Sequence, residues 1–167
     1  STEIALKMSG PDTILGEIGE AVQENMESYE IELNGKTLPI KTIKNLTGHQ
    51  IEPYKIHAGK SVPNYKIDYP IRMKEGEYYA IETFSTTGTG ETKEMGDCSH
   101  YMIDYNTDYK NIPLAIKDRR CFDSILKTFS TLAFCNRWLD DSKIPKYNRY
   151  LKSLYSTGVI KKYPPLC

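Results

Sequence analysis

The chain has 167 residues, 39% of them apolar and 26% charged, and this length and composition predict one folded domain with a hydrophobic core of its own. Because 22 Lys and Arg residues balance 22 Asp and Glu residues, the net charge is zero, which argues against binding nucleic acid or an anionic membrane through a basic surface. No apolar run in the sequence approaches the roughly 20 residues of a membrane span, so we expect no membrane association.

The cysteines favour a reducing compartment. The sequence has four of them and no C-x-x-C pair, so we expect neither a disulfide framework nor a thiolate zinc site. We therefore expect a cytoplasmic protein with free thiols. The chain begins at Ser1 without an initiator Met and stops at Cys167, and we interpret both ends as cut edges of a longer protein.

The first 40 residues predict two helices and a hairpin. Apolar residues at helical spacing in 1–8 indicate the end of one helix, and Gly10-Pro11 then breaks the chain. Residues 15–29 repeat apolar side chains every three or four positions, with glutamates between them, which is typical of an amphipathic helix. Asn34-Gly35 between two short β-forming runs predicts a two-residue hairpin turn.

The middle of the chain predicts two main strands. The run 77–84 (EYYAIETF) is the richest in β-formers, and its alternation places Tyr78, Ala80 and Glu82 on one face and Tyr79 and Ile81 on the other. A second strand is expected at 98–103, with His100 on the same side as Met102.

The last 60 residues are more helical. The pattern predicts a long helix over 118–139 and a second over about 146–156, ended by Gly158 and followed by a short strand. We expect Trp138 and the aromatic stripe 122–134 to lie in the core. Lys143, Lys146, Arg149 and Lys152 form a mild basic row, which we interpret as a solvated helix face.

The three histidines and one carboxylate carry the chemical interpretation. His49, His57 and His100 are each compatible with a structural, hydrogen-bonded residue, but histidine is also the commonest metal ligand and a general acid or base at neutral pH. Glu82 stands between Ile81 and Thr83, in an apolar neighbourhood where a carboxylate is costly unless it is paired, protonated or metal-bound. Spacing alone leaves open a metal site, a catalytic histidine cluster or a solvated Glu, since His49-x7-His57 fits no standard zinc pattern.

Five ordered segments resemble the type 2 methionine aminopeptidases. They are GHQIEPYKIHAGKSVP, MKEGEYYAIETF, CSHYM, TLAFCNRWL and KYPPLC, and EIGEAVQENMESYEIELNGK resembles the helix and hairpin that precede the first. The resemblance implies an α+β fold, part of the pita-bread (creatinase/aminopeptidase) fold with an inserted, winged-helix-like helical subdomain. It assigns 1–103 to the catalytic domain, 104–162 to the insertion, and 163–167 to the return to the catalytic domain.

The same resemblance assigns roles to matching residues. His49 and Glu82 match metal ligands, Glu82 also matches the carboxylate that takes a proton from the attacking water, and His57 matches a catalytic histidine that contacts the substrate near the scissile amide. Further residues match positions around the pocket for the N-terminal methionine. They are Ile56, His57, His100, Ala133, Tyr163 and Leu166.

The implied activity is removal of the initiator methionine from nascent proteins by a centre of two divalent ions, of Co, Mn, Zn or Fe. The implied partners are nascent polypeptides that begin with Met, with ribosome association, no membrane and no sequence-specific nucleic acid. The family uses five ligands, and its two aspartates would precede Ser1 while its last glutamate would follow Cys167. We therefore predict that this chain alone is inactive and binds its metals incompletely.

Two other interpretations are open at this point. The chain could be a non-catalytic relative of the same fold that acts as a ribosome- or RNA-associated binding protein, although the presence of His49, His57, Glu82 and His100 argues against a decayed site. Alternatively, the helical insertion could serve mainly as an interaction surface, for which the basic row is the one candidate feature.

Overall fold

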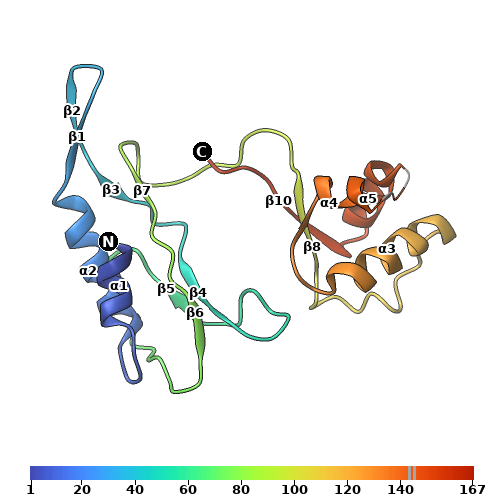
Figure 1. Cartoon of the computed structure of the whole chain (residues 1–167), viewed down its shortest axis with the longest axis horizontal. Coiled ribbons are helices and arrows are strands. Elements are labelled where there is room, and N and C mark those ends of the chain that lie inside the picture. Colours follow the sequence, from blue (N-terminus) through green and yellow to red (C-terminus); the bar gives the residue numbers. More distant parts are fainter. Residues whose placement is uncertain (143, 145) are drawn as a thin grey trace. The chain divides into compact units, whose positions relative to one another are not determined.

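A computed structural model describes residues 1–167 except 143 and 145. The chain divides into two compact units, Ser1–Lys93 and Glu94–Cys167 (Figure 1). Each unit has its own buried apolar cluster, and each is described here by itself. The assignment of 104–162 as an insertion into a larger domain stays a prediction.

The first unit begins with two helices, α1 (Thr2–Met8) and α2 (Leu15–Glu27), as the apolar spacing predicts. The two helices pack against each other, and α2 buries one apolar face. Gly19 on that helix lies against the segment that contains Pro63 and Tyr65. A Cβ atom at position 19 would be 2.5 Å from the Tyr65 carbonyl oxygen. Leu15, Ile18, Val22 and Met26 join Ala5, Val62 and Met73 in the core of this unit.

The predicted hairpin is confirmed. β1 (Glu30–Leu33) pairs antiparallel with β2 (Lys36–Pro39), and the connecting Asn34 and Gly35 both have positive φ, 53° and 70°. These values match the type I′ turn that suits the right-handed twist of a hairpin. Every residue of β1 is solvent-exposed, so the turn and the strand pairing define this hairpin and the core does not.

A three-stranded antiparallel sheet follows, in the order β5-β4-β6. Its strands are β4 (Gly48–Ile51), β5 (Ser61–Val62) and β6 (Tyr78–Ala80), and a separate pair joins β3 (Lys41–Thr42) to β7 (Ser85–Thr86). The predicted strand 77–84 is shorter than expected and ends at Ala80. Its neighbour β4 begins at Gly48, one residue before the last paired residue His49, so from Glu82 onwards no residue of β4 lies opposite this segment.

The second unit contains another antiparallel sheet, in the order β10-β8-β9, with three helices. The strands are β8 (His100–Ile103), β9 (Phe134–Cys135) and β10 (Ile160–Tyr163), and the helices are α3 (Ile116–Phe129), α4 (Asn136–Asp141) and α5 (Tyr147–Ser156). One face of the sheet packs on the helices around a core that includes Ile103, Phe122, Ile125, Phe134, Leu154 and Ile160.

The prediction of a single helix over 118–139 is wrong. α3 ends at Phe129, Ser130 turns the backbone with φ 54° and ψ −130°, and β9 then pairs with β8 before α4 begins. Burial of Phe134 and Cys135 against β8 outweighs the helical periodicity of the segment. The expectation for Trp138 is also wrong: it is 44% exposed and stacks on Phe129 at 5.8 Å between ring centroids.

None of the helices described combines the length and apolar character that crossing a bilayer requires.

Candidate functional site

His49 and Glu82 meet in the first unit. His49 is in β4, and β4–β6 pairing sets it opposite Ala80, two residues before Glu82. The Nε2 atom of His49 is 3.2 Å from Oε1 of Glu82, while its Nδ1 atom lies 3.3 Å from the Gln50 carbonyl oxygen. The His49 side chain is 12% exposed and the Glu82 side chain 42% exposed, so the pair lies at the solvent boundary. The prediction that Glu82 lies within the strand is wrong, because β6 ends at Ala80, two residues before it.

His57 completes a three-residue cluster. It belongs to the loop between β4 and β5, and its ring lies 4.2 Å from that of His49, centroid to centroid, with 60° between the planes. Burial lowers the pKa of His57 below its usual value, the neighbouring His49 lowers it further, and the Glu82 carboxylate opposes both effects. An imidazole with a lowered pKa is neutral at pH 7, the form that accepts a proton or binds a cation. Ile56, half-buried, immediately precedes it.

The donor types of this cluster suit a divalent transition metal, but their number falls short. One imidazole nitrogen and one carboxylate oxygen converge, and both are common ligands of such ions. Nowhere in the described part of the chain do three or more His, Cys, Asp or Glu side chains gather so as to hold a metal ion. A protein site for such an ion needs at least three ligands, so these residues do not form one by themselves.

The other predicted pocket residues lie in the second unit. His100 in β8 pairs with Cys135 of β9 on one side and with Tyr163 of β10 on the other, so Tyr163 is its direct cross-strand neighbour. The His100 Nδ1 atom lies 3.0 Å from the Ser99 hydroxyl, and the Tyr163 hydroxyl is 4.0 Å from the Met102 sulfur. The prediction that His100 and Met102 share a face agrees with this register.

Ala133 and Leu166 lie close in sequence to these strands. Ala133 directly precedes β9, and Leu166 forms an isolated bridge with Glu94. The structure thus gathers the predicted residues into two groups, one in each unit. His49, His57 and Glu82 form the first, and His100 and Tyr163 form the second.

Sequence reasoning missed a charged network beside the first group. The Lys60 ammonium donates to both carboxylate oxygens of Glu77 at 2.6 and 2.7 Å, and the Tyr79 hydroxyl donates to Glu77 Oε2 at 2.7 Å. Hydrogen bonds from Lys60 and Tyr79 lower the pKa of Glu77 to about 2. Burial and the bond to Glu77 raise the pKa of Tyr79. Lys60 and Glu77 each directly precede a sheet strand, but their spacing in sequence gives no indication that they pair.

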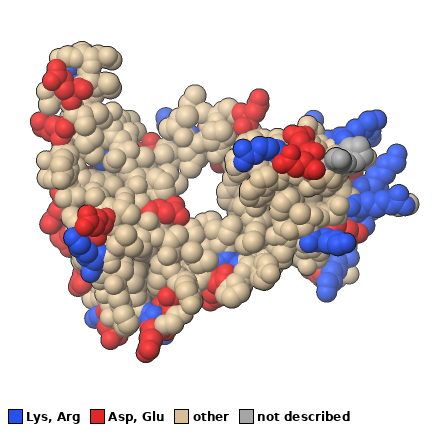
Figure 2. Space-filling view, viewed as in Figure 1, with Lys and Arg blue, Asp and Glu red and all other residues tan. Residues whose placement is uncertain are grey.

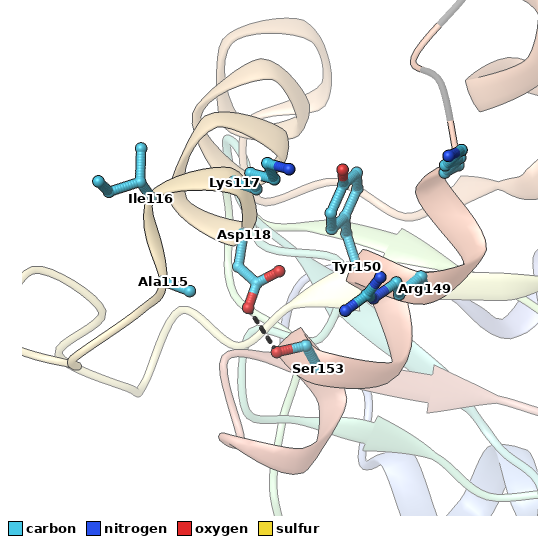
Figure 3. A pocket seen from close by; sticks show the side chains of 8 residues that line it. Ala115, Ile116, Lys117, Asp118, Arg149, Tyr150 and Ser153 are labelled. Carbon is cyan, nitrogen blue, oxygen red and sulfur yellow. Dashed lines mark hydrogen bonds between the residues drawn. The ribbon is translucent and has the colours of Figure 1, made fainter.

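A hollow of about 420 Å³ lies between α3 and α5 in the second unit (Figure 3). Asp118 accepts a hydrogen bond from the Ser153 hydroxyl at 2.7 Å, and Lys117 extends towards Tyr150. Lys117, Lys146 and Arg149 line this hollow. Figure 2 shows Lys and Arg side chains gathered on the surface over these helices. Of the predicted basic row, Lys146, Arg149 and Lys152 are exposed on or next to α5, and Lys143 lies outside the described residues.

Comparison with known proteins shows which family the chain belongs to. The chain is 46% identical to a methionine aminopeptidase 2 of Laccaria bicolor, 48% identical to methionine aminopeptidase 2A of Arabidopsis thaliana and 47% identical to methionine aminopeptidase 2 of Schizosaccharomyces pombe. Each match covers 100% of this chain. This chain is related over its whole length to the type 2 methionine aminopeptidases.

The relationship covers only part of those proteins. The chain spans 46%, 38% and 39% of the three relatives, less than half of each. No family model matches the sequence. Among solved structures, one titled as a thermophilic Arx1 superposes with a TM-score of 0.58 at 18% identity, over 77% of this chain and 36% of that one, which is a likeness of fold. The structure is mixed α and β, consistent with that likeness.

Proposed function

We propose that this chain is the central to C-terminal part of a methionine aminopeptidase, which removes the initiator methionine from newly made cytoplasmic proteins. The observation that carries the proposal is the 3.2 Å contact between His49 Nε2 and Glu82 Oε1, with the His57 ring against it, in a chain related throughout to these enzymes. In this proposal the two units belong to a pita-bread fold, and 104–162 forms its winged-helix-like insertion.

The residues take distinct parts in peptide hydrolysis. His49 and Glu82 would supply two of the ligands that hold divalent ions in the complete protein, and such ions would lower the pKa of a bound water and stabilise developing negative charge. Glu82 also accepts the proton of the attacking water, since a carboxylate held next to a histidine is a competent general base. His57, neutral at pH 7, contacts the substrate beside the scissile amide.

The second group recognises the methionine side chain. Aliphatic, aromatic and imidazole groups form a surface that suits an unbranched thioether. In this proposal His100, Ala133, Tyr163 and Leu166, all in the second unit, supply it. The substrates are polypeptides with an N-terminal Met, presented as they leave the ribosome.

The test is cleavage of a Met-Ala-Ser peptide by the full-length protein that carries this sequence, with added Mn or Co, beside the 167-residue chain alone. We expect turnover by the full-length protein, none by the chain alone, and loss of turnover in His49→Ala. The non-catalytic alternative predicts no turnover by any of them. Absence of cleavage by metal-loaded full-length protein overturns the proposed function, and turnover by the chain alone overturns the expectation that three further ligands are needed.

A further inference from the structure

The sheet β5-β4-β6 has two chemically different faces. Its alternation directs Gln50, Tyr79 and Ile81 to the interior: Gln50 is buried, and Tyr79 and Ile81 pack against the core of α1 and α2. The residues between them, including His49 and Glu82, therefore lie on the opposite face. The face that carries the candidate catalytic pair is thus the one turned away from the core.

The same face continues into two exposed apolar side chains. Ile51 in β4 is directly opposite Tyr78 in β6, and the two are 37% and 75% exposed. Each lies two residues along its strand from the pair His49 and Ala80. At about 3.4 Å per residue, the Ile51–Tyr78 pair is displaced by roughly 7 Å from His49 along the sheet.

The charges next to this pair are already compensated. Glu52, which follows Ile51, is bonded by the Lys55 ammonium at 3.2 Å, and Glu77, which precedes Tyr78, is held by Lys60. A side chain that settles on Ile51 and Tyr78 therefore meets an aliphatic group and an aromatic ring, and the two carboxylates adjacent in sequence, Glu52 and Glu77, are each paired with a lysine. Such a surface favours an apolar occupant.

We propose that the Ile51–Tyr78 pair is a substrate subsite that binds an apolar side chain at the third or fourth residue of a Met-initiated peptide. The inference rests on the proposed function, because it takes the scissile amide to lie at His49 and Glu82. An extended peptide also rises about 3.4 Å per residue, so the chain beyond the second residue reaches the pair when it runs along this face. The occupant is the continuation of the substrate, since the pair lies on the same sheet face as His49 and only two residues further along each strand.

This subsite acts on binding and not on the chemical step. Its contacts lie away from the reacting amide and are equal in the ground and transition states, so they lower KM and leave kcat unchanged. Removing the tyrosine ring and the isoleucine side chain removes the preference for an apolar residue.

The experiment compares three peptides with the full-length protein: Met-Ala-Ser-Ser, Met-Ala-Leu-Ser and Met-Ala-Ser-Leu. We expect at least one leucine peptide to have a KM about fivefold below that of the serine peptide, at equal kcat. The double variant Ile51→Ser with Tyr78→Ser equalises the KM values. The matched control Tyr29→Ser changes a tyrosine that is also exposed but lies between α2 and β1, and it keeps the preference.

Calorimetric titration of the metal-free protein with the same peptides separates this inference from the proposed function, because binding is then measured without cleavage. Cleavage without a leucine preference, or a preference that survives the double variant, overturns the subsite and leaves the proposed function standing. If no peptide is cleaved, the proposed function fails and the titration decides: tighter binding of a leucine peptide, lost in the double variant, supports the subsite, and equal binding overturns it. A melting temperature close to wild type in each variant excludes unfolding as the cause.

Discussion

His49 Nε2 and Glu82 Oε1 lie 3.2 Å apart because β4 and β6 pair in the register that sets His49 opposite Ala80. A shift of one residue in that register would turn one of the two side chains towards the opposite face of the sheet. Two contacts stabilise this register. Tyr79 and Ile81 pack on the core, and Gly48 has no side chain to collide with the Ala80 carbonyl oxygen, which lies 2.5 Å from where a Cβ atom would be. The core packing of one face therefore positions the chemistry of the other.

Glu82→Gln should abolish most activity of the full-length protein without unfolding it. The side chain is 42% exposed, so the loss of its charge removes little packing, whereas loss of a general base lowers kcat by about 100-fold or more. Steady-state cleavage of Met-Ala-Ser checks the rate, and thermal melting checks the fold. Glu52→Gln, directly after β4, is the control and should keep wild-type kcat. A wild-type kcat in Glu82→Gln would contradict the assigned role.

Acid stability should depend on the Lys60–Glu77 contact. The folded-state pKa of Glu77 is lowered to about 2 from an ordinary 4.5, so this carboxylate stabilises the fold above its unfolded pKa, and the stabilisation is lost as the pH falls from about 5 towards 2. Glu77→Gln should be less stable than wild type at pH 7 and should lose less of its stability on acidification over that window. Urea unfolding at a series of pH values measures the difference. Glu30→Gln, exposed in β1, should follow the wild-type curve, and parallel wild-type and Glu77→Gln curves would refute the linkage.

Gly19→Ala should destabilise the protein by about 1–3 kcal/mol. Its new Cβ would lie 2.5 Å from the Tyr65 carbonyl oxygen and 2.9 Å from the Pro63 Cβ, so the loop that packs on α2 must move. Gly10→Ala is the matched control, since a Cβ there meets no described atom within 4 Å, and it should be close to neutral. Urea titration measures the free energy of unfolding of both variants. Equal values would show that the loop moves away from the new Cβ atom without loss of stability.

The thiols should differ sharply in reactivity. Burial, together with the nearby Asp118 carboxylate, raises the pKa of Cys121 to about 11, whereas Cys167 is exposed. Because the thiolate is the reactive form, a disulfide reagent at pH 8 should label Cys167 readily in the folded protein and Cys121 only after unfolding. Mass spectrometry of the labelled peptides identifies the sites. If native protein is labelled at Cys121 as fast as at Cys167, the burial of the Cys121 side chain in α3 is contradicted.

Local patterns in the sequence were sufficient for the elements whose stability is local. The spacing of apolar residues from Leu15 predicts α2, and Asn34-Gly35 predicts the hairpin, because both depend on neighbours a few positions away. Alternation also predicts that Tyr79 and Ile81 lie on one face and Tyr78 on the other, and the structure agrees, since Tyr79 and Ile81 pack on the core while Tyr78 is exposed. The identities of His49, His57 and Glu82 as candidate residues came from ordered motifs and not from spacing, and their catalytic roles stay a prediction.

Only the tertiary structure decided where periodic segments end and which distant residues meet. The pattern over 118–139 is helical throughout, yet the chain turns at Ser130 because Phe134 gains a place in a buried ladder beside Tyr101. Likewise, strand pairing sets His100 beside Tyr163 and brings Glu82 to His49, with Lys60 bonded to Glu77 nearby. The spacing of these residues in the sequence does not indicate such contacts, because the contacts depend on long-range strand pairing. Burial of a side chain in the core outweighs the local preference of the segment that carries it.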